Sequence, residues 1–528
     1  MSASERATTA GVIDALRAAS SGEGWRVSFV DADGLPCPAQ AFLELTPPAF
    51  ADVTFDSRAV TPGSLFVCKG ATFREQYLID AASRGAAAYL AERAHPSCGL
   101  PGVVCADVRR AMAHAADAFF GHPSGDLRLV AVTGTKGKTT VAFYVDAILR
   151  SRVPARRSAL LTGVVLDDGV SRTHADNTTP EAVELQRHLA NAVAAGCDAG
   201  VMEASSQGFK YDRTLCARFA VGVFTNIGED HVSPHEHPTF EDYFASKLRI
   251  FGQSDVGVVD LDADHATRIL DAARAACPRV VTYSLHDAAA DVRLSSCEHL
   301  GQGLWRLGVV LPGGRGLQTT LPALGSFNVS NALAAAAACD ALGVDADAIA
   351  RGLSVVRVPG RMERHDAPDG SLVGIVDYAH NEMSMRAALS CLRQEFPDRE
   401  LTVVFGSCGT RGVDRRPGLG RAAAELADRV ILTEDDPGPV SVSSICEEIA
   451  SYAREAGGDP LIVCDRPAAV HAAVEGAHRP AVVLLAGKGA EDSILRASGR
   501  VPCRPDAGLF CDEVGVPFEG YAGLYEER

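Results

Sequence analysis

Leu-Arg-Leu-Val-Ala-Val-Thr-Gly-Thr-Lys-Gly-Lys-Thr-Thr, residues 127–140, is the stretch that decides the fold. Its first half is an apolar run typical of a buried strand, and a helical pattern follows over residues 138–150. A turn of glycine, lysine and threonine lies between them. Backbone N–H groups at such a turn, together with the amino end of the helix, bind phosphate groups. The stretch therefore predicts a strand, a phosphate-binding loop and a helix.

Within this loop, Lys138 is expected to reach the terminal phosphates of a nucleotide and Thr139 to coordinate magnesium. The strict Gly-x4-Gly-Lys-Ser/Thr spacing is not met, because Val132 stands where its first glycine would be. An ordinary strand-turn-helix unit is the alternative. The residues predicted to bind the nucleotide here are Gly134, Thr135, Lys136, Gly137, Lys138, Thr139 and Thr140.

The remaining chain alternates apolar runs with helical segments, which predicts an α/β protein. Buried strands are expected at 199–203 and 220–226, and a helix at 328–342. Beyond residue 357, the runs 372–376, 401–405, 430–433, 461–464 and 481–486 leave room for one helix each. That rhythm is typical of a doubly wound parallel sheet. With a breaker cluster at 121–125, we expect three domains, 1–125, 126–357 and 358–528, the last Rossmann-like.

The composition excludes several classes of protein. Apolar residues make up 47% of the 528 residues and charged residues 22%, which is typical of a folded globular chain. The net charge of -17 disfavours nucleic acid and anionic lipid as partners, and no apolar run approaches the roughly 18 residues of a membrane span. Fifteen cysteines without a Cys-x-x-Cys pair indicate neither disulfides nor zinc. We expect a cytoplasmic protein that holds any anionic substrate at a local cationic site.

Acidic residues follow two of the predicted strands. Glu203 ends a buried run, where a lone carboxylate costs several kcal/mol unless a cation or hydrogen bonds compensate it. Magnesium is one such cation; a helix cap or a salt bridge is the alternative. Glu229, Asp230 and His231 follow the next strand, where a surface histidine is the alternative. These motifs point to a metal site only together with the phosphate loop.

Taken in order, the motifs resemble those of the Mur ligases over residues 56–492. They are Thr133-Gly-Thr-Lys-Gly-Lys-Thr139, Asn177-Thr-Thr-Pro-Glu181, Glu203-Ala-Ser-Ser206, Asn226-Ile-Gly-Glu-Asp-His231, Tyr243-Phe-Ala-Ser-Lys247, Gly325-Ser-Phe-Asn328 with Asn331, Pro359-Gly-Arg-Met-Glu363, Asp377-Tyr-Ala-His380 and Gly487-Lys-Gly489. The resemblance implies a UDP-sugar-binding domain, an ATP-binding ligase domain and an amino-acid-binding domain. It implies an ATP-dependent acid–amino-acid ligase of peptidoglycan synthesis that adds the third amino acid to UDP-N-acetylmuramoyl-L-alanyl-D-glutamate.

The resemblance also assigns the catalytic residues. In this family ATP phosphorylates a carboxylate and an amine displaces the phosphate, so neutralising negative charge carries most of the catalysis. Lys138, Glu203, His231 and Lys247 are implied to be catalytic. Thr139 and Glu203 are implied to hold one Mg²⁺, and His231 with a carbamylated Lys247 the other. A lysine ammonium cannot ligate a cation, whereas its carbamate offers carboxylate-like oxygens. Without the family context, Lys247 is a solvated surface lysine.

The remaining site residues are also implied by the resemblance. ATP is expected to contact Asn331, Arg361, Asp377 and His380. The UDP-muramoyl peptide is expected at Ser57, Arg58, Thr178, Thr179, Ser205, Gln207 and Arg213; Arg58 alone would be read as a surface charge. The incoming amino acid is expected at Arg411, Asp435, Asp436, Gly487 and Glu491.

The segment Asp435-Asp-Pro-Gly438 favours L-lysine as the amino acid added. Members that add meso-diaminopimelate carry Asp-Asn-Pro-Arg there, and the arginine binds the distal carboxylate as a bidentate pair. Gly438 supplies no such partner, while Asp436 suits an ammonium group. Gly438 also departs from the lysine-adding members, so ornithine, another diamine or meso-diaminopimelate stays open.

Two other interpretations remain. One is another amide ligase with the same core, such as a folylpolyglutamate synthase or the cyanophycin type, which the uridine-binding turn at 55–58 and the run 177–181 disfavour. The other is a nucleotide-binding regulator that has kept the fold without catalysis. We expect a monomer with small-molecule substrates only.

Overall fold

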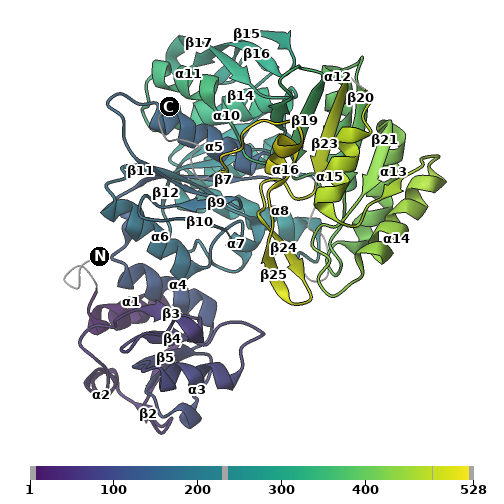
Figure 1. The fold of residues 1–528 in the computed structure, drawn as a ribbon. Helices are drawn as coiled ribbons and strands as arrows, with labels where there is room; N and C mark the ends of the chain where they lie inside the picture. The colour runs from purple at the N-terminus through teal and green to yellow at the C-terminus, as the bar shows by residue number, and fades with distance from the viewer. Residues whose placement is uncertain (1–6, 176, 229–235, 479, 522–528) are drawn as a thin grey trace. The chain divides into compact units, whose positions relative to one another are not determined.

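The computed structural model describes residues 7–175, 177–228, 236–478 and 480–521. Helices and strands alternate along the chain and form three large sheets, which confirms the predicted α/β class (Figure 1). The chain packs as two compact units, one built from residues up to 294 with 309–317 and 331–352, the other from the remaining residues. None of the described helices has the length and apolar character that crossing a membrane requires. The three-domain boundaries stay a prediction.

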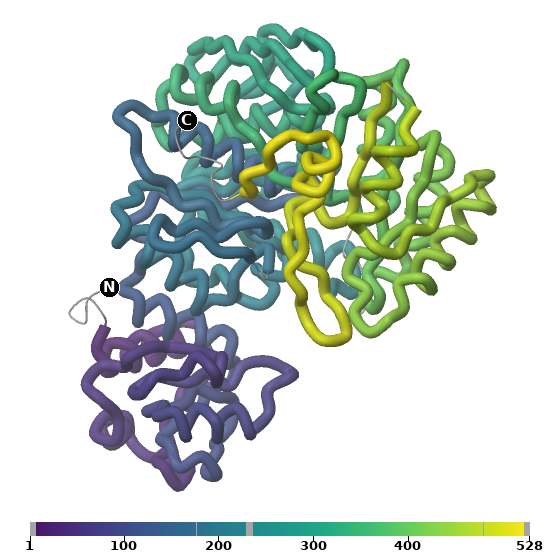
Figure 2. The backbone as a smooth tube through the Cα atoms, in the orientation of Figure 1, coloured from purple at the N-terminus to yellow at the C-terminus, as the bar shows by residue number. Residues whose placement is uncertain are grey.

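The first sheet belongs to the N-terminal part of the chain, which is purple in Figure 2. Its strand order is β2-β1-β6-β5-β4-β3, in which β3 to β6 are parallel. Its strands are β1 (Val27–Val30), β2 (Pro36–Cys37), β3 (Val53–Thr54), β4 (Leu65–Val67), β5 (Ala88–Ala91) and β6 (Gly102–Cys105). Its helices are α1 (Thr9–Glu23), α2 (Ala39–Glu44), α3 (Glu75–Ser83) and α4 (Val108–Phe119). Buried Leu16, Met112 and Leu90 join α1, α4 and β5 in one apolar core.

The second sheet has the order β10-β9-β8-β11-β7-β12-β13-β14-β15-β16-β17. Its strands are β7 (Arg128–Thr133), β8 (Ser158–Leu161), β9 (Val165–Asp167), β10 (Arg172–His174), β11 (Ala199–Glu203), β12 (Phe219–Phe224), β13 (Ser254–Asp260), β14 (Arg279–Ser284), β15 (Val292–Gly301), β16 (Leu304–Leu311) and β17 (Arg315–Pro322). Its helices are α5 (Lys138–Arg150), α6 (Ala182–Ala194), α7 (Ser206–Lys210), α8 (Phe240–Leu248), α9 (Ala266–Ala276), α10 (Phe327–Ala341) and α11 (Ala346–Val355).

The parallel register of this sheet brings three strand ends together. Glu203 of β11 lies opposite Val132 of β7, and Phe224 of β12 lies opposite Thr133. Because carboxyl ends of parallel strands share one edge, the loops that follow β7, β11 and β12 are neighbours. β7 reads as a continuous apolar run because both its faces are buried. The helix expected at 138–150 is confirmed with the same bounds.

The third sheet has the order β18-β19-β23-β20-β21-β22, with β18 alone antiparallel to its neighbour. Its strands are β18 (Glu363–Asp366), β19 (Leu372–Asp377), β20 (Glu400–Phe405), β21 (Arg429–Leu432), β22 (Leu461–Ile462) and β23 (Ala481–Ala486). Its helices are α12 (Glu382–Glu395), α13 (Arg416–Leu426), α14 (Val442–Glu455), α15 (Arg466–Glu475) and α16 (Asp506–Glu513). A hairpin of β24 (Ser493–Arg496) and β25 (Gly499–Pro502) follows β23. The five predicted strands are thus confirmed.

Candidate functional site

The predicted phosphate loop fills the turn between β7 and α5. Gly134 and Gly137 have φ of 148° and 84°, a region that side-chain-bearing residues rarely adopt. A Cβ on Gly134 would lie 2.0 Å from Thr225 Oγ1, and one on Gly137 would lie 2.5 Å from Asn331 Oδ1. The two glycines are therefore required by both conformation and space. The same contact places Asn331 of α10 beside the loop.

The loop is held in shape by the residues that follow β12. Asn226 Oδ1 accepts a hydrogen bond from the Lys136 backbone N–H (2.9 Å), and its backbone oxygen accepts one from the Thr135 N–H (3.0 Å). The Thr225 hydroxyl donates to the Lys136 oxygen at 2.8 Å. Because these contacts fix the loop backbone in advance, a bound phosphate would need little rearrangement.

Lys138 curls back over the loop that precedes it. Its Nζ donates to the backbone oxygens of Gly134 (2.9 Å) and Thr135 (3.2 Å). A second lysine, Lys247 of α8, reaches the same Gly134 oxygen with its Nζ at 2.8 Å. Lys247 is 2% exposed and its ammonium lies 4.6 Å above the centre of the Tyr243 ring. Lys247 is thus a buried neighbour of the loop and not a surface lysine.

The two residues expected to hold one metal ion are in direct contact. The Thr139 hydroxyl donates to Glu203 Oε1 at 3.0 Å, and the same oxygen accepts the Gly163 N–H at 2.9 Å. Glu203 is 2% exposed at the end of β11. A hydroxyl and a carboxylate are hard oxygen donors of the kind Mg²⁺ prefers, so the donor set fits this ion. Of the two ligands predicted for the second ion, Lys247 lies beside the loop, while His231, like Glu229 and Asp230, lies outside the described residues.

Three of the polar residues expected to bind the muramoyl peptide, Thr179, Ser205 and Arg213, form a connected cluster. The Thr179 hydroxyl accepts the Ser205 backbone N–H at 2.9 Å and lies 3.0 Å from the Ser205 hydroxyl. Arg213 donates to the Thr179 oxygen at 2.9 Å. Thr178 immediately precedes Thr179 in sequence and packs against Gly163. Gln207 lies in α7, beside the cluster in sequence.

Glu181 forms a charged hub at the start of α6 that sequence analysis did not identify as one. Its carboxylate pairs with Arg213 (3.0 Å), Lys69 (3.1 Å) and Arg109 (3.4 Å). Burial lowers the pKa of Lys69, and the charge of Glu181 offsets this decrease only in part. The Lys69 ammonium also lies 3.8 Å above the centre of the Phe55 ring. The Glu184 carboxylate, which accepts the Glu181 backbone N–H at 3.2 Å, adds a second negative charge near Lys69, so the three cations exceed the two carboxylates by one. Its members are too far apart in sequence to form a motif.

Ser57 and Arg58 lie on the short 3₁₀ turn Ser57–Ala59. The Arg58 side chain is 84% exposed and pairs with Asp56 at 2.8 Å. The hydrogen bond from Arg58 lowers the pKa of Asp56. The turn is therefore ordered by its own residues and presents Arg58 to solvent.

In the second compact unit, the Arg361 guanidinium and the His380 ring both pack against the ring of Tyr378. Its ring centre lies 4.6 Å from the Arg361 guanidinium and 4.8 Å from the centre of the His380 ring. Asp377, at the end of β19, accepts the Met362 N–H at 2.8 Å. Three residues expected at the nucleotide thus lie at one strand end.

The residues expected at the incoming amino acid also lie together, with one addition. Lys488 is 1% exposed, and its ammonium pairs with Asp436 (3.1 Å) and Glu491 (2.5 Å). The two carboxylates proposed for a substrate ammonium therefore already share a protein ammonium. A Cβ on Gly487 would lie 2.5 Å from Asp435 Oδ2, so that glycine allows close approach. Burial raises the pKa of Asp435 to about 6.

Arg411 follows β20 in an exposed loop. Burial raises the pKa of nearby Cys408, and the positive charge of Arg411 offsets part of that rise. The ligand atoms of Cys408, Asp435 and Asp436 lie within 4.8 Å of one another.

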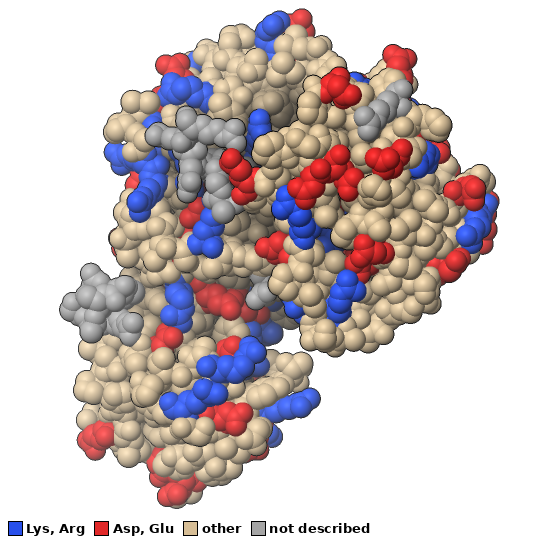
Figure 3. All heavy atoms as spheres, in the orientation of Figure 1, with Lys and Arg blue, Asp and Glu red and all other residues tan. Residues whose placement is uncertain are grey.

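Over this unit, as over the rest of the face drawn in Figure 3, acidic and basic side chains are interspersed.

Comparison with known proteins identifies the family. Residues 132–339 match the Mur ligase middle domain, and residues 360–489 match the Mur ligase glutamate ligase domain. A UDP-N-acetylmuramyl-tripeptide synthetase of Lactobacillus acidophilus is 36% identical over 83% of this chain and 87% of its own length. A UDP-N-acetylmuramoyl-L-alanyl-D-glutamate--L-lysine ligase of Enterococcus faecalis is 35% identical over 90% of this chain and 92% of its own.

Among solved structures, a UDP-N-acetylmuramoyl-L-alanyl-D-glutamate--2,6-diaminopimelate ligase is similar with a TM-score of 0.61 and 27% identity, covering 88% of this chain and 95% of that one. Sequence family, curated relatives and fold thus agree with the motifs read along the chain. The chain belongs to the Mur ligase family.

Proposed function

We propose that this protein is an ATP-dependent ligase that adds the third amino acid to UDP-N-acetylmuramoyl-L-alanyl-D-glutamate. The observation that carries the proposal is the gathering of Lys138, Thr139, Glu203 and Lys247 around one glycine turn. The names and similarity of the relatives support the same reaction. In that reaction the substrate carboxylate takes the terminal phosphoryl group of ATP, and the amine then displaces inorganic phosphate from the acyl phosphate.

The residues of the loop would act by position and charge. Lys138 would leave its contacts with the loop oxygens and neutralise the transferring phosphoryl group. Thr139 and Glu203 would hold Mg²⁺, which supplies positive charge between the phosphates. Asn331 would flank the nucleotide beside Gly137, and Arg361, Asp377 and His380 would complete its binding. The backbone of residues 134–140 would supply N–H donors to the phosphates.

We infer that Lys247 is carbamylated in the active enzyme and that it holds a second Mg²⁺ together with His231. The position of Lys247 supports this proposal, because the side chain is 2% exposed and its Nζ lies 2.8 Å from the Gly134 oxygen of the phosphate loop. A carbamate would bring oxygen donors next to the phosphate loop. We expect Lys247→Ala to abolish turnover without rescue by bicarbonate, and near-normal turnover of this variant would remove the carbamate from the mechanism.

The dipeptide carboxylates would bind near the hub at Glu181. Lys69, Arg109 and Arg213 bring three positive charges to the carboxylates of Glu181 and Glu184, and this surplus suits an anionic substrate in a chain of net charge -17. Thr178, Thr179, Ser205 and Gln207 would contact the muramoyl peptide, and Ser57 with Arg58 the uridine end. The proposed division is 1–125 for the UDP-sugar, 126–357 for ATP and 358–528 for the amino acid, in a cytoplasmic monomer.

We propose L-lysine as the amino acid added. Gly438 offers no side chain to a second carboxylate, and its φ of 58° disfavours one. Asp435, Asp436 and Glu491 outnumber the single ammonium of Lys488, so the site remains negative around a substrate ammonium. Arg411 would bind the α-carboxylate. The enzyme, its UDP-linked dipeptide, ATP and Mg²⁺ should release phosphate faster with L-lysine than with L-ornithine or meso-diaminopimelate. A preference for meso-diaminopimelate would contradict the specificity argument alone.

A further inference from the structure

A cavity of about 510 Å³ lies at the end of the second sheet opposite the phosphate loop. Its lining includes Arg128 at the start of β7, Arg152 and Arg156 just after α5, and Asp198 just before β11. Val344, before α11, lies in the wall. The phosphate loop lies at the amino end of α5, and a helix of this length spans about 20 Å. The cavity is therefore separate from the site described above.

Three arginines of this cavity share one carboxylate. Asp198 pairs with Arg152 through both oxygens (2.7 and 2.8 Å), with Arg128 at 2.8 Å and with Arg156 at 3.1 Å. Burial raises the pKa of Asp198, but hydrogen bonds and charge from Arg152 and Arg128 outweigh it and lower the pKa to about 2. The carboxylate is therefore ionised at neutral pH and still outnumbered.

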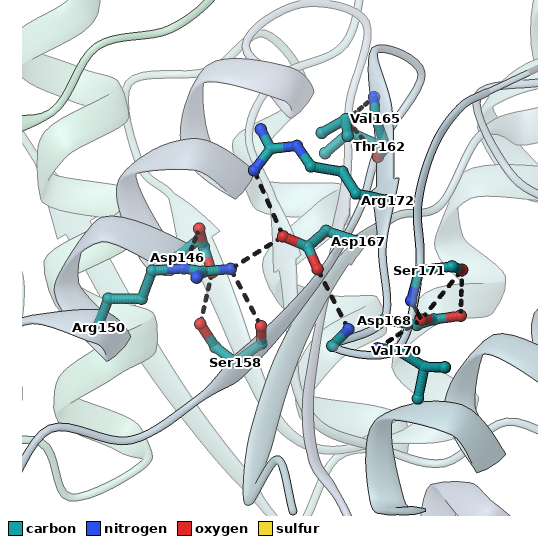
Figure 4. Close-up of polar contacts among 11 residues, drawn as sticks. Asp146, Arg150, Ser158, Thr162, Val165, Asp167, Asp168, Val170, Ser171 and Arg172 are labelled. Carbon is teal, nitrogen blue, oxygen red and sulfur yellow. Dashed lines mark hydrogen bonds and ion pairs between the residues drawn. The ribbon is translucent and has the colours of Figure 1, made fainter. Parts of the chain in front are cut away.

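Nearby carboxylates do not remove the surplus. Figure 4 shows Arg150, the last residue of α5, occupied by Asp146 (2.9 Å) and Asp167 (3.3 Å), with Asp167 also near Arg172. These acids are engaged with other arginines. Asp345, in the cavity wall, accepts the Ala348 N–H at 2.8 Å as a helix cap. Even with Asp345 counted, the lining keeps one net positive charge.

The three arginines differ in how many of their guanidinium nitrogens are engaged in hydrogen bonds to described residues. Arg152 uses its Nε on the Leu149 oxygen and both terminal nitrogens on Asp198, so its role is structural. Arg128 divides its terminal nitrogens between Asp198 and the Leu342 oxygen. Arg156 is 55% exposed and, among the described residues, pairs with Asp198 through Nη1. Its remaining N–H groups are available to a ligand at the cavity mouth.

We propose that this cavity binds a phosphate-bearing anion at a second site, distinct from the phosphate loop. A planar guanidinium fork matches phosphate oxygens bidentately, and Arg156 would supply that fork while Arg128, whose terminal nitrogens are engaged, adds positive charge beside it. The volume is that of a small-molecule pocket and exceeds what one phosphate needs, so it accommodates pyrophosphate or a phosphate ester. Residues Val153 and Pro154 supply an apolar rim against which an organic group would pack.

The test is calorimetric titration of the full-length protein at low ionic strength, with the phosphate loop first saturated by a non-hydrolysable ATP analogue. Inorganic pyrophosphate and glucose 1-phosphate are the two probes. We expect saturable binding of at least one probe to the wild type, and at least tenfold weaker binding to Arg156→Glu. Arg218→Glu is the matched control, because the Arg218 side chain is 80% exposed and lies 4.0 Å from Asp255, away from this cavity; it should weaken binding less than threefold.

The outcomes separate the sources of the ligand. Tighter binding of pyrophosphate identifies a free polyphosphate as the ligand class, and tighter binding of glucose 1-phosphate identifies an organic phosphate. No saturable binding of either probe to the wild type would overturn the proposal. So would equal losses in Arg156→Glu and Arg218→Glu, because these would indicate a general charge effect and not a site.

Discussion

The buried pair Arg466–Asp506 offers the sharpest test of how the third sheet positions its site. Arg466, the first residue of α15, and Asp506, the first of α16, are 2% exposed, and Arg466 donates two hydrogen bonds of 2.6 Å to the Asp506 carboxylate. Arg466 also donates to the backbone oxygens of Glu434 (2.9 Å) and Ala486 (3.0 Å). These carbonyls immediately precede Asp435 and Gly487. Arg466 is therefore a positioning residue that ties two strand ends to two helices.

Replacing Arg466 by methionine should destabilise this unit by about 3–5 kcal/mol, because it leaves the Asp506 carboxylate buried without a partner. Two orphaned backbone oxygens add to the loss, at about 1 kcal/mol or more each when no water replaces the donor. The double variant Arg466→Met, Asp506→Leu should recover most of the loss from the unpaired charge. Arg421→Met is the matched control, since Arg421 and Glu455 are 47% and 60% exposed at 3.4 Å, and should cost under about 1 kcal/mol.

Hydrogen exchange of β20 and β23 in increasing urea measures the unfolding free energy of this unit. The apparent KM for L-lysine, measured on folded Arg466→Met at low temperature, should rise more than kcat falls, because the strand ends that carry Asp435 and Gly487 are loosened. A loss below 1 kcal/mol, or a double variant as unstable as Arg466→Met, would refute the reasoning that an uncompensated buried charge dominates.

Three further predictions rest on single contacts. Burial raises the pKa of Asp435 to about 6, so its ionisation makes folding less favourable as pH rises from about 4 through 6. Over that window Asp435→Asn should gain up to about 3 kcal/mol in unfolding free energy relative to wild type, measured by urea titration at each pH. A difference that does not change with pH would contradict this. Gly137→Ala should abolish ATP binding, measured by calorimetry, because of its φ of 84° and an amide oxygen at 2.5 Å, whereas Gly125→Ala, with open space around it, should bind normally. Lys69→Met should raise the KM for the UDP-linked dipeptide about tenfold or more with little change in kcat, and Lys69→Arg should recover part of it, since either cation pairs with Glu181; an unchanged KM would place the substrate elsewhere.

The fold could be predicted wherever a strand is buried on both faces. The runs at 372–376 and 481–486 became β19 and β23, because parallel strands between helices are continuously apolar. β15 and β16 were not predicted. Most of β15 is exposed, so the segment 292–301 carries Arg, Ser, Glu and His and shows no apolar run. A strand whose side chains are mostly exposed to solvent has no apolar run in its sequence by which it could be predicted.

The candidate site divides in the same way. Lys138, Thr139 and Glu203 could be predicted because a glycine turn after a buried strand and a carboxylate at the next strand end are local signals. Lys69 and Arg109 could not, because their meeting with Glu181 depends on how separate parts of the first unit pack. No local pattern distinguishes these two from ordinary surface cations.

Lys488 shows why charge counted along a sequence is a weak guide to specificity. Asp436 and Glu491 suggest a receptor for a substrate ammonium, yet the structure supplies an ammonium of its own between them. Burial opposes the charge of Lys488, and the three carboxylates around it outweigh that effect and raise its pKa. Three carboxylates against one ammonium leave two negative charges for a substrate ammonium, and one of the two is lost when Asp435 is protonated. Since the pKa of Asp435 is about 6, selection for L-lysine over a neutral analogue should weaken below pH 6, where this carboxyl becomes neutral. Competition of L-lysine with L-norleucine, measured by phosphate release between pH 5.5 and 8, tests that step. A ratio independent of pH would show that Asp436 and Glu491 suffice despite their partner.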